Sequence, residues 1–419
     1  MVKIHRLRSH QKIGGINLKR KCILLLTSFF SLFLLAGCWS KTELNDLAIA
    51  TAMAIDKAED GYLVSVQVLN PSQIASQQTM MTTETAVTTY HSSGGTILEA
   101  LRELTKEIPG KLYLAHIRIV IFGEEVAREG IRKPLDFLSR DYEFRTDFYI
   151  LVSRYGMASP LLNVLTSLER IPANSIFTTL QMSQTRWAPT KGVTLDELIE
   201  NLVKLGQDPV LTGIYVKGEE QAGNSIKNIE LVDPPAVLKV DNLAAFHGDR
   251  LIDWLNNEES MGYIYVLGNV RSTIEHIPCD KDDNGKVTIE IMQSTPEVKA
   301  KVVKGEPKVG IKVKAEGNVA DVECLIDLTD PKKIQELQET IEKTIEEKIE
   351  KVVEKAKNDL QSDILGFGEA IHRSNPKLWK KLKNEWKEHF PTISHTTKVE
   401  VKIRRFGTIT DSFQEESED

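Results

Sequence analysis

The residue with the clearest chemistry in this chain is Cys38, which directly follows the small residues Ala36 and Gly37. Its thiol can act as a nucleophile, and the small side chains before it let an enzyme reach the backbone. The preceding segment is basic first and apolar second, with seven Lys or Arg side chains and no acid before Glu43. That order is typical of a secretory signal. We therefore expect residues 1–37 to be a signal peptide that is removed, and the Cys38 thiol to accept a diacylglycerol.

The alternative for this segment is an ordinary transmembrane anchor. A bilayer core needs about 20 apolar residues, whereas the apolar run from Cys22 to Ala36 is shorter and contains three Thr or Ser side chains. The junction before Cys38 also resembles that of bacterial lipoproteins, so the lipid anchor is favoured. Two acyl chains such as palmitate anchor a protein stably, at about 0.8 kcal/mol per buried CH₂.

The charge balance limits the classes of function. The chain has 53 basic and 60 acidic side chains, a net charge of −7. Removing residues 1–37 takes away seven basic and no acidic side chains, which leaves −14. Charge therefore does not hold the protein at an anionic leaflet. No basic face with interleaved aromatic residues is evident, which argues against nucleic-acid binding.

Only two cysteines remain once the signal and the acylated residue are set aside. Cys279 and Cys324 lie near predicted strands and could pair in an oxidising compartment. We favour two unpaired, partly buried thiols instead. No spacing of Cys and His suits a zinc site, so no metal and no cofactor are expected.

Two acidic clusters suggest a calcium site and a glycosidase site, but each lacks a residue or motif that such a site requires. Residues 280–285 resemble the first half of a calcium loop, but the position that requires a bidentate acid is Ile291, so a hairpin turn is favoured. Asp249 and Asp253 lie near Trp254, as paired acids would in a glycosidase. Acids on an exposed helix face are far commoner, and no second motif supports the glycosidase. The sequence has no GxSxG, HExxH or phosphate loop, so we expect no enzyme activity.

The segment from Phe246 to Leu255 is expected to form a helix against the sheet of its domain. Gly248 before its charged turn can adopt backbone conformations that other residues resist. Arg250 is predicted to be structural, pairing with an acid or capping a carbonyl. The alternative is a contact with a protein partner, because Arg is enriched at interface hot spots. Trp254 is expected, like Arg250, to have either a structural role or a role in an interface.

The apolar pattern predicts an α+β protein. Since the chain exceeds what one core usually holds, three mixed domains are expected, each a β-sheet packed with helices. The predicted boundaries give a first domain at 38–194, a second at 195–275, a third at 276–410 and an acidic tail at 411–419.

The elements of the first two domains follow from apolar periodicity and turn residues. The first domain should contain strands at 47–55, 62–69, 112–122 and 147–152, helices at 97–104 and 124–138, and a connection at 171–195. The second should contain a helix at 195–204 and strands at 210–216, 226–232 and 238–240.

The third domain is predicted to be an antiparallel sheet with a long helix. Residues 297–303 and 310–316 alternate apolar with charged side chains, as strands with one wet face do. Pro331 begins a helix whose apolar stripe runs to Ile364 in steps of three or four. Those steps drift off a heptad seam, so the helix should pack on its own sheet rather than form a coiled coil. Glu346 is expected on its solvated face.

Four stretches of the sequence share a pattern with one known family. They are Cys38-Trp39 with Glu43–Ile49, Glu143–Arg145, Ala245–Leu251 with Trp254 and Gly262, and Asp363–Gly368 through Ile371–Pro376 to Trp379 and Trp386. Together they resemble the Ger(x)C family, the lipoprotein C subunits of nutrient germinant receptors in endospore-forming bacteria. The likeness spans essentially the whole chain after residue 37.

The resemblance implies three mixed domains and a complex with two integral membrane germinant-receptor subunits at the inner spore membrane. It implies a part in germinant-triggered signalling and no catalysis. We therefore expect a receptor component held at the outer leaflet of the cell membrane by diacylglycerol on Cys38. The alternative is a substrate-binding lipoprotein that delivers a small nutrient to a membrane transporter, which requires a cleft with convergent polar groups.

Overall fold

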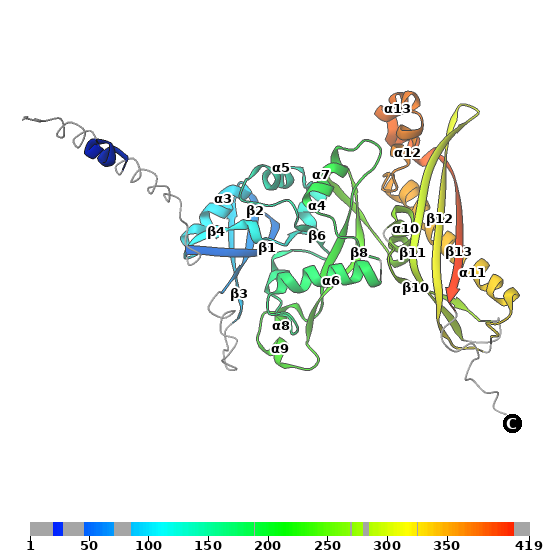
Figure 1. Cartoon of the computed structure of the whole chain (residues 1–419), viewed down its shortest axis with the longest axis horizontal. Coiled ribbons are helices and arrows are strands. Elements are labelled where there is room, and N and C mark those ends of the chain that lie inside the picture. Colours follow the sequence, from blue (N-terminus) through cyan, green and yellow to red (C-terminus); the bar gives the residue numbers. More distant parts are fainter. Residues whose placement is uncertain are drawn as a thin grey trace, which may run out of the picture. The chain divides into compact units, whose positions relative to one another are not determined.

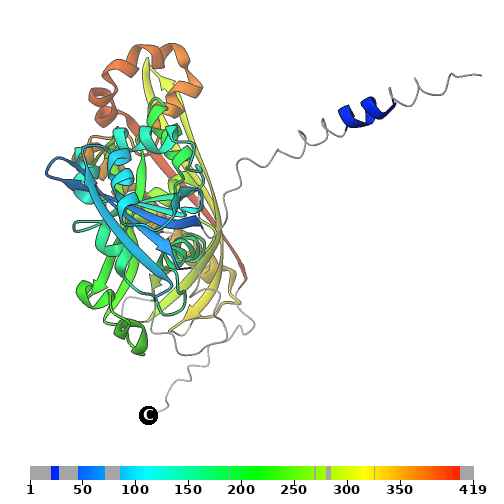
Figure 2. The same ribbon diagram turned by 90° about the vertical axis from the view of Figure 1, so that its left-hand side faces the viewer.

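The computed structural model describes residues 20–27, 46–70, 85–187, 189–268, 270–279, 285–324 and 326–405. They fall into two units, a short N-terminal segment that ends at Leu47 and a body that begins at Ala48 (Figure 1, Figure 2). The described part of the first unit is a helix over residues 20–27. None of the helices in the described ranges is long and apolar enough to cross a membrane. Cys38 and the tail at 411–419 lie outside the described residues.

The larger sheet of the body has nine strands. They are β1 (Leu47–Ala58), β2 (Gly61–Leu69), β3 (Val87–Gly94), β4 (Lys111–Tyr113), β5 (Ile119–Phe122), β6 (Tyr149–Ser153), β7 (Val210–Gly218), β8 (Ala236–His247) and β9 (Arg250–Leu255). Their order is β3-β2-β1-β5-β6-β7-β8-β9, with β4 paired to β1. β1, β5, β6 and β7 run parallel. Their residues are mostly buried, as is usual for parallel strands covered on both faces.

Helices cover both faces of this sheet. They are α3 (Ile97–Glu103), α4 (Glu124–Glu129), α5 (Arg132–Arg140), α6 (Pro172–Arg186), α7 (Leu195–Val203), α8 (Glu220–Gly223) and α9 (Lys227–Glu230). Leu101, Leu135 and Leu198 from α3, α5 and α7 are buried in one core. Ile176 and Leu180 from α6 are buried in a separate core. The two cores lie on opposite faces, which gives three layers.

The C-terminal half of the body is built on a second sheet of four strands. Its elements are α10 (Asn257–Leu267), β10 (Thr273–Pro278), β11 (Lys286–Val303), β12 (Glu306–Val322), α11 (Pro331–Glu354), a π-helical turn (Lys355–Leu360), α12 (Phe367–Ser374), α13 (Pro376–Leu382), α14 (Trp386–His389) and β13 (Ser394–Arg405). β10, β11 and β12 are antiparallel, and β13 is added parallel to β12. The predicted α+β class, with a last sheet and a long helix, is confirmed.

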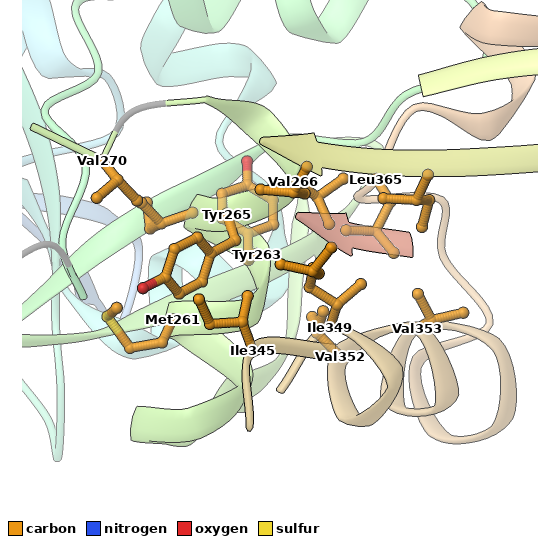
Figure 3. Packing of buried hydrophobic residues seen from close by; sticks show 14 of the residues in the cluster. Met261, Tyr263, Tyr265, Val266, Val270, Ile345, Ile349, Val352, Val353 and Leu365 are labelled. Atoms are coloured by element: carbon orange, nitrogen blue, oxygen red, sulfur yellow. The ribbon is translucent and has the colours of Figure 1, made fainter. Parts of the chain in front are cut away.

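The apolar stripe of α11 packs on its own sheet, as predicted. Ile341, Ile345, Ile349 and Val352 are fully buried in one core with the apolar residues of β11, β12 and β13. Figure 3 shows Ile345, Ile349 and Val352 of α11 beside Tyr263 and neighbouring residues of α10. The stripe therefore serves the fold of this chain rather than a coiled coil with a second helix.

Helix α10 is apolar around most of its circumference and lies between the larger sheet and α11. A capping box at its start satisfies the backbone N–H groups of Asn256 and Glu259. Gly262 lets α10 approach α11 closely, because a Cβ atom there would lie only 2.1 Å from the carbonyl oxygen of Lys348. The core of α10 and α11 includes residues of both sheets, such as Leu243 of β8 and Ile311 of β12.

Helix α11 also covers the free edge of β13. The side-chain oxygens of Gln338, Glu342 and Glu346 accept hydrogen bonds of 3.1, 2.9 and 2.9 Å from three alternate backbone N–H groups of β13. Glu346 was expected on the solvated face of the helix, but it is partly buried and bonded to β13, so that expectation was wrong. The sequence pattern places it beside the apolar stripe, but only the position of β13 gives it a partner.

A disulfide joins Cys279 to Cys324, so the preference for two unpaired thiols was wrong. The bond links the residue after β10 to the second residue after β12, and β11 lies between these two strands in the sheet. The separation of 45 positions between the cysteines hid this proximity, because it depends on the register of the whole hairpin.

The expected helix over 246–255 is a β-hairpin. Phe246 and His247 end β8, Arg250 begins β9, and Gly248 makes the turn with φ +58°. The conformational freedom expected of Gly248 is therefore used, but in a turn rather than before a helix. The helix was predicted from apolar spacing over only ten residues. In the structure these residues pair across the turn as two antiparallel strands instead.

Other predicted elements differ in extent or type. The connection at 171–195 contains the 15-residue helix α6, whose Ser, Thr and Gln side chains hid its short apolar stripe. The strand predicted at 226–232 contains the helical turn α9. The strand at 112–122 and the helix at 124–138 are each broken in two, the helix at Gly130, where φ is +130°. Strands before and after the predicted boundary at residue 194 belong to the same nine-stranded sheet.

Candidate functional site

Two stretches that the sequence singled out, 245–251 and 363–368, meet where the nine-stranded sheet contacts the C-terminal helices. The link between them is Asp208, in the loop between α7 and β7. We call this meeting point the junction and define it by Asp208, His247, Gly248, Ser362 and Asp363.

The carboxylate of Asp208 holds the β8–β9 turn and the segment that follows the long helix together. It accepts a hydrogen bond of 2.6 Å from the Ser362 hydroxyl and one of 2.8 Å from the backbone N–H of Gly248. The Nδ1 atom of His247 lies 3.3 Å from the same carboxylate. The Ser362 hydroxyl is also 2.7 Å from the carbonyl oxygen of Phe246. One acid thus holds together two segments that are far from it and from each other in the sequence.

The carboxylate of Asp363 is buried and fixes the start of α12. It accepts hydrogen bonds from the backbone N–H groups of Phe367 (2.9 Å) and Gly368 (2.7 Å) and from the indole N–H of Trp386 (3.1 Å). The carbonyl oxygen of Asp363 in turn accepts a hydrogen bond of 2.9 Å from the backbone N–H of Asp208. The two acids are therefore connected through the backbone.

Two glycines allow the backbones to touch at the junction. A Cβ atom on Gly206, where φ is +85°, would lie 2.7 Å from the carbonyl carbon of Gly368. A Cβ atom on Gly368 would lie 2.7 Å from Cα of Gly206 and 2.8 Å from the ring of Trp379. Gly368 is thus required by close packing, which accounts for the second glycine of the Gly-Phe-Gly sequence at 366–368.

Burial and hydrogen bonding act in opposite directions on the two acids. Burial alone would raise the pKa of Asp208, but hydrogen bonds from His247, Ser362 and Gly248 lower it below its ordinary value. Burial raises the pKa of Asp363 to about 7, against the effect of the backbone N–H groups of Gly368 and Phe367. The nearby charge of Asp208 raises it further.

The stability of the chain should therefore depend on pH between about 4 and 7. Because the pKa of Asp363 is higher in the folded state than its ordinary 3.8, the folded state holds a proton that the unfolded state releases. Raising the pH from 5.5 to 7 is expected to lower the free energy of unfolding by on the order of 2 kcal/mol. Denaturant titrations at several pH values measure this slope. Asp363→Asn should flatten it, and an equal slope in both proteins would contradict the assignment.

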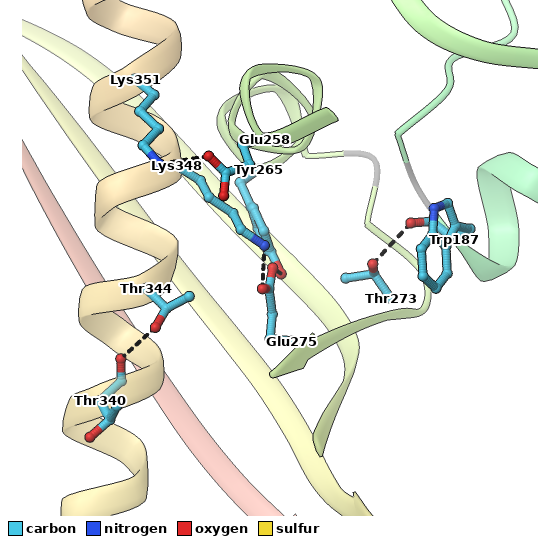
Figure 4. Close-up of polar contacts among 9 residues, drawn as sticks. All are labelled: Trp187, Glu258, Tyr265, Thr273, Glu275, Thr340, Thr344, Lys348 and Lys351. Atoms are coloured by element: carbon cyan, nitrogen blue, oxygen red, sulfur yellow. Dashed lines mark hydrogen bonds and ion pairs between the residues drawn. The ribbon is translucent and has the colours of Figure 1, made fainter. Parts of the chain in front are cut away.

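A second buried polar group connects α10, α11 and β10. Glu275, which is 1% exposed, forms an ion pair with Lys348 and accepts a hydrogen bond of 3.1 Å from the Tyr265 hydroxyl (Figure 4). Burial raises the pKa of Tyr265 well above its ordinary value, so the hydroxyl is a donor. The Thr273 hydroxyl donates to the carbonyl oxygen of Trp187 at 2.9 Å. These contacts position the three elements, and the carboxylate of Glu275 is bonded to both Lys348 and Tyr265.

A cavity of about 670 Å³ lies beside the junction. Its lining includes the charged residues Lys204, Glu297, Lys299, Lys301, Glu369 and Arg373. Lys299 and Glu297 pair at 2.5 Å, and Arg373 and Glu369 approach to 3.8 Å, so much of the charge is compensated within the lining.

One group of side chains has the composition of a catalytic triad but not its geometry. The Nδ1 atom of His91 lies 2.7 Å from the hydroxyl of Ser65. Ser65 is fully buried, and the carboxylate of Asp56 accepts hydrogen bonds from the backbone N–H groups of Ala158 and Ser159 at 2.6 and 2.8 Å. A buried hydroxyl cannot reach a substrate, so this group is structural.

The predicted site residues are only partly brought together. The guanidinium of Arg250 is exposed and has no hydrogen bond or ion pair with any residue in the described ranges. Neither form of its predicted structural role, pairing with an acid or capping a carbonyl, is therefore found for Arg250 within these ranges. Its neighbour Asp249 makes the contact instead, accepting from the backbone N–H of Arg132 at 3.2 Å. Trp254 is half-buried, and its indole N–H lies 3.4 Å from Glu124 Oε1.

Two functional-site expectations concern metals and lipid. Most of the calcium-like segment, residues 280–284, lies outside the described residues, as Cys38 does. Within the described part of the chain, no group of three or more His, Cys, Asp or Glu side chains could hold a metal ion.

Sequence reasoning missed the residues that join the two stretches. Asp208 stands in the turn-like sequence Gly-Gln-Asp-Pro, and nothing local shows that its partners lie 40 and 154 residues away. Ser362 directly precedes Asp363, where the last of the four family-like stretches begins. Only that position could have drawn attention to Ser362.

Comparisons with known proteins cover nearly the whole chain. The model "Spore germination protein N-terminal domain" matches residues 40–216, and "Spore germination B3/GerAC like, C-terminal" matches residues 241–407. Spore germination protein KC of Bacillus subtilis (strain 168) is 31% identical over 394 residues, which cover 93% of this chain and 96% of that protein. Spore germination protein B3 of the same strain is 24% identical and covers 91% and 97%.

A solved structure has the same fold. The crystal structure of the GerBC protein superposes with a TM-score of 0.50 at 19% identity and covers 84% of this chain and 96% of that one. The junction connects the two matched regions, because Asp208 lies in the first and Asp363 in the second.

Proposed function

Because this chain belongs to the spore germination B3/GerAC-like family, we propose that it is a lipid-anchored, non-catalytic subunit of a nutrient germinant receptor that works in germination signalling. The observation that carries the proposal is the similarity to spore germination protein KC over 96% of that protein's length. Three buried acids, Asp208, Glu275 and Asp363, are consistent with a non-catalytic role, since each is bonded to a backbone or side-chain partner.

We propose that the body lies outside the cytoplasm, at the outer leaflet of the inner spore membrane. The Cys279–Cys324 disulfide supports this location, because disulfides form and persist in oxidising compartments and are rare in the cytosol. The sequence before Cys38 supports the same side of the membrane, since its basic-then-apolar order is that of an exported protein.

In this proposal the acyl chains on Cys38 act as a tether to two integral membrane subunits of the receptor. Confinement to the leaflet raises the local concentration of the body near those subunits without any new contact. Even a modest protein–protein interface would then give stable recruitment.

Cys38→Ala tests the tether. We expect the variant chain to leave the membrane fraction and nutrient-triggered germination to slow by about tenfold or more, because the gain in effective concentration is lost. Fractionation of spores and the rate of germination measure the two effects. Cys22→Ala is the matched control, because that cysteine belongs to the segment expected to be removed. Normal membrane retention and normal germination in Cys38→Ala would refute the anchor.

A further inference from the structure

An arginine clamped between aromatic rings lies at the end of β6. The guanidinium of Arg154 is 4.9 Å from the ring centre of Tyr155 and 5.3 Å from that of Trp254. Tyr155 in turn meets Tyr215 of β7 edge to face at 5.6 Å. We call these four residues the arginine clamp. It lies at the carboxyl end of a parallel strand, the edge where open α/β sheets commonly bind their ligands.

The sheet is shaped to form this clamp. Gly213 of β7 leaves room for the indole of Trp254, because a Cβ atom there would lie 2.5 Å from the indole ring. A bulge displaces the pairing of β7 and β8 beside Gly213, where Asn242 has φ +58°. Bulges of this kind redirect side chains and are common next to binding sites.

The backbone is also strained at the clamp. Tyr155 has φ +76°, and Tyr155 and Asn242 are two of the four non-glycine residues with positive φ in the described ranges. The backbone N–H of Tyr155 donates to Glu124 Oε2 at 3.0 Å, while the other carboxylate oxygen of Glu124 lies 3.4 Å from the indole nitrogen of Trp254. Glu124 thus contacts both the backbone of Tyr155 and the indole of Trp254. Strain of this kind persists only where surrounding contacts enforce it, and it concentrates at functional sites.

The guanidinium at the centre of the clamp has no anionic partner. Arg154 makes no side-chain hydrogen bond or ion pair with any residue in the part of the chain that the structure describes. The other charges nearby are matched, since Arg128 pairs with Glu124 at 2.6 Å and Lys239 with Asp241 at 2.7 Å. The clamp therefore presents one uncompensated positive charge, oriented by two rings and able to bind a planar carboxylate through two N–H groups.

We propose that the arginine clamp binds the carboxylate of an Asp or Glu on an extended segment of a partner protein. The single net charge fits one carboxylate, whereas an anionic membrane surface is bound by clusters of several basic side chains. The rim fits a peptide, because Tyr155 is 73% exposed and Met157 is 49% exposed beside it. Tyr, Trp, Arg and Met are the residue types enriched at protein interfaces. This inference rests on the proposed function for the identity of the partner, a membrane subunit of the receptor.

The test uses the full chain in detergent and overlapping peptides that cover the extramembrane segments of the two membrane subunits. We expect a peptide with an Asp or Glu to bind and to change the fluorescence of Trp254. Arg154→Gln should weaken that binding by about tenfold or more. Arg154→Lys should weaken it less, because lysine keeps the positive charge but lacks the two parallel N–H groups of the guanidinium. Replacing the acid of the peptide by its amide should have the same effect without any change in the chain.

Arg132→Gln is the matched control, because Arg132 is an exposed Arg that is paired only loosely, 3.9 Å from Asp249. It should leave peptide binding unchanged. Equal binding by Arg154→Gln and the unaltered chain would overturn the proposal. So would binding to vesicles of phosphatidylglycerol that depends on Arg154 while no peptide binds. Failure here leaves the proposed function standing, since Cys38→Ala tests the anchor separately.

Discussion

Ile345→Asp is expected to unfold the C-terminal half of the body at temperatures where the unaltered chain is folded. Ile345 is fully buried between α10 and the second sheet. The substitution removes the burial of a large aliphatic side chain and places a carboxylate in an apolar core. We expect a loss of at least about 4 kcal/mol in the free energy of unfolding. Thermal melting followed by far-UV and near-UV circular dichroism measures it.

Two neighbours on the same turn of α11 provide graded controls. Glu347 is exposed and only 4.0 Å from Lys343, so Glu347→Ala should change stability by less than about 0.5 kcal/mol. Glu346→Ala removes the acceptor of the Val399 N–H and should cost about 1 kcal/mol. Equal losses for all three variants would show that the burial pattern assigned to the helix is incorrect.

Loss of the Cys279–Cys324 disulfide should produce the second large effect. The bond closes a loop of 45 residues, and cross-linking a loop of that length stabilises a protein by about 4 kcal/mol through the entropy of the unfolded chain. The double variant Cys279→Ser, Cys324→Ser should therefore melt well below the unaltered chain.

Chemical reduction supplies an independent measurement of the same contribution. A reductant should lower the melting temperature of the unaltered chain to that of the double variant and leave the double variant itself unchanged. If the reductant lowers both equally, the stabilisation does not come from this bond.

Elements whose signal is local were predictable from the sequence. The stripe of α11 repeats along all 24 residues of the helix, and the pair Asp330 and Pro331 marks its start, so the start of the helix was placed correctly. Its predicted stripe was too long, because the helical segment ends at Leu360 and Ile364 lies beyond it. The hairpin of β8 and β9 was mistaken for a helix, because a strand is identified by its partner and six residues carry little periodicity of their own. Helix α6 was missed for the opposite reason, since its polar residues hide a stripe that only the sheet beneath it reveals.

The candidate site was predictable only in its parts. The stretches around His247 and Asp363 were singled out, but the residue that joins them, Asp208, has no local signature. The same holds for the arginine clamp, where Trp254 was noted and Arg154 was not. These hydrogen bonds and ring contacts join residues tens of positions apart, so they depend on the register of the strands. That register cannot be inferred from the residue pattern of a single sequence.

Because α11 covers the edge of β13, it affects how several copies of the chain can associate. A strand at the end of a sheet normally offers a row of backbone donors on which another copy can grow, strand upon strand. Here three of those donors are already occupied by Gln338, Glu342 and Glu346. Many copies could therefore crowd on one surface without polymerising through this edge.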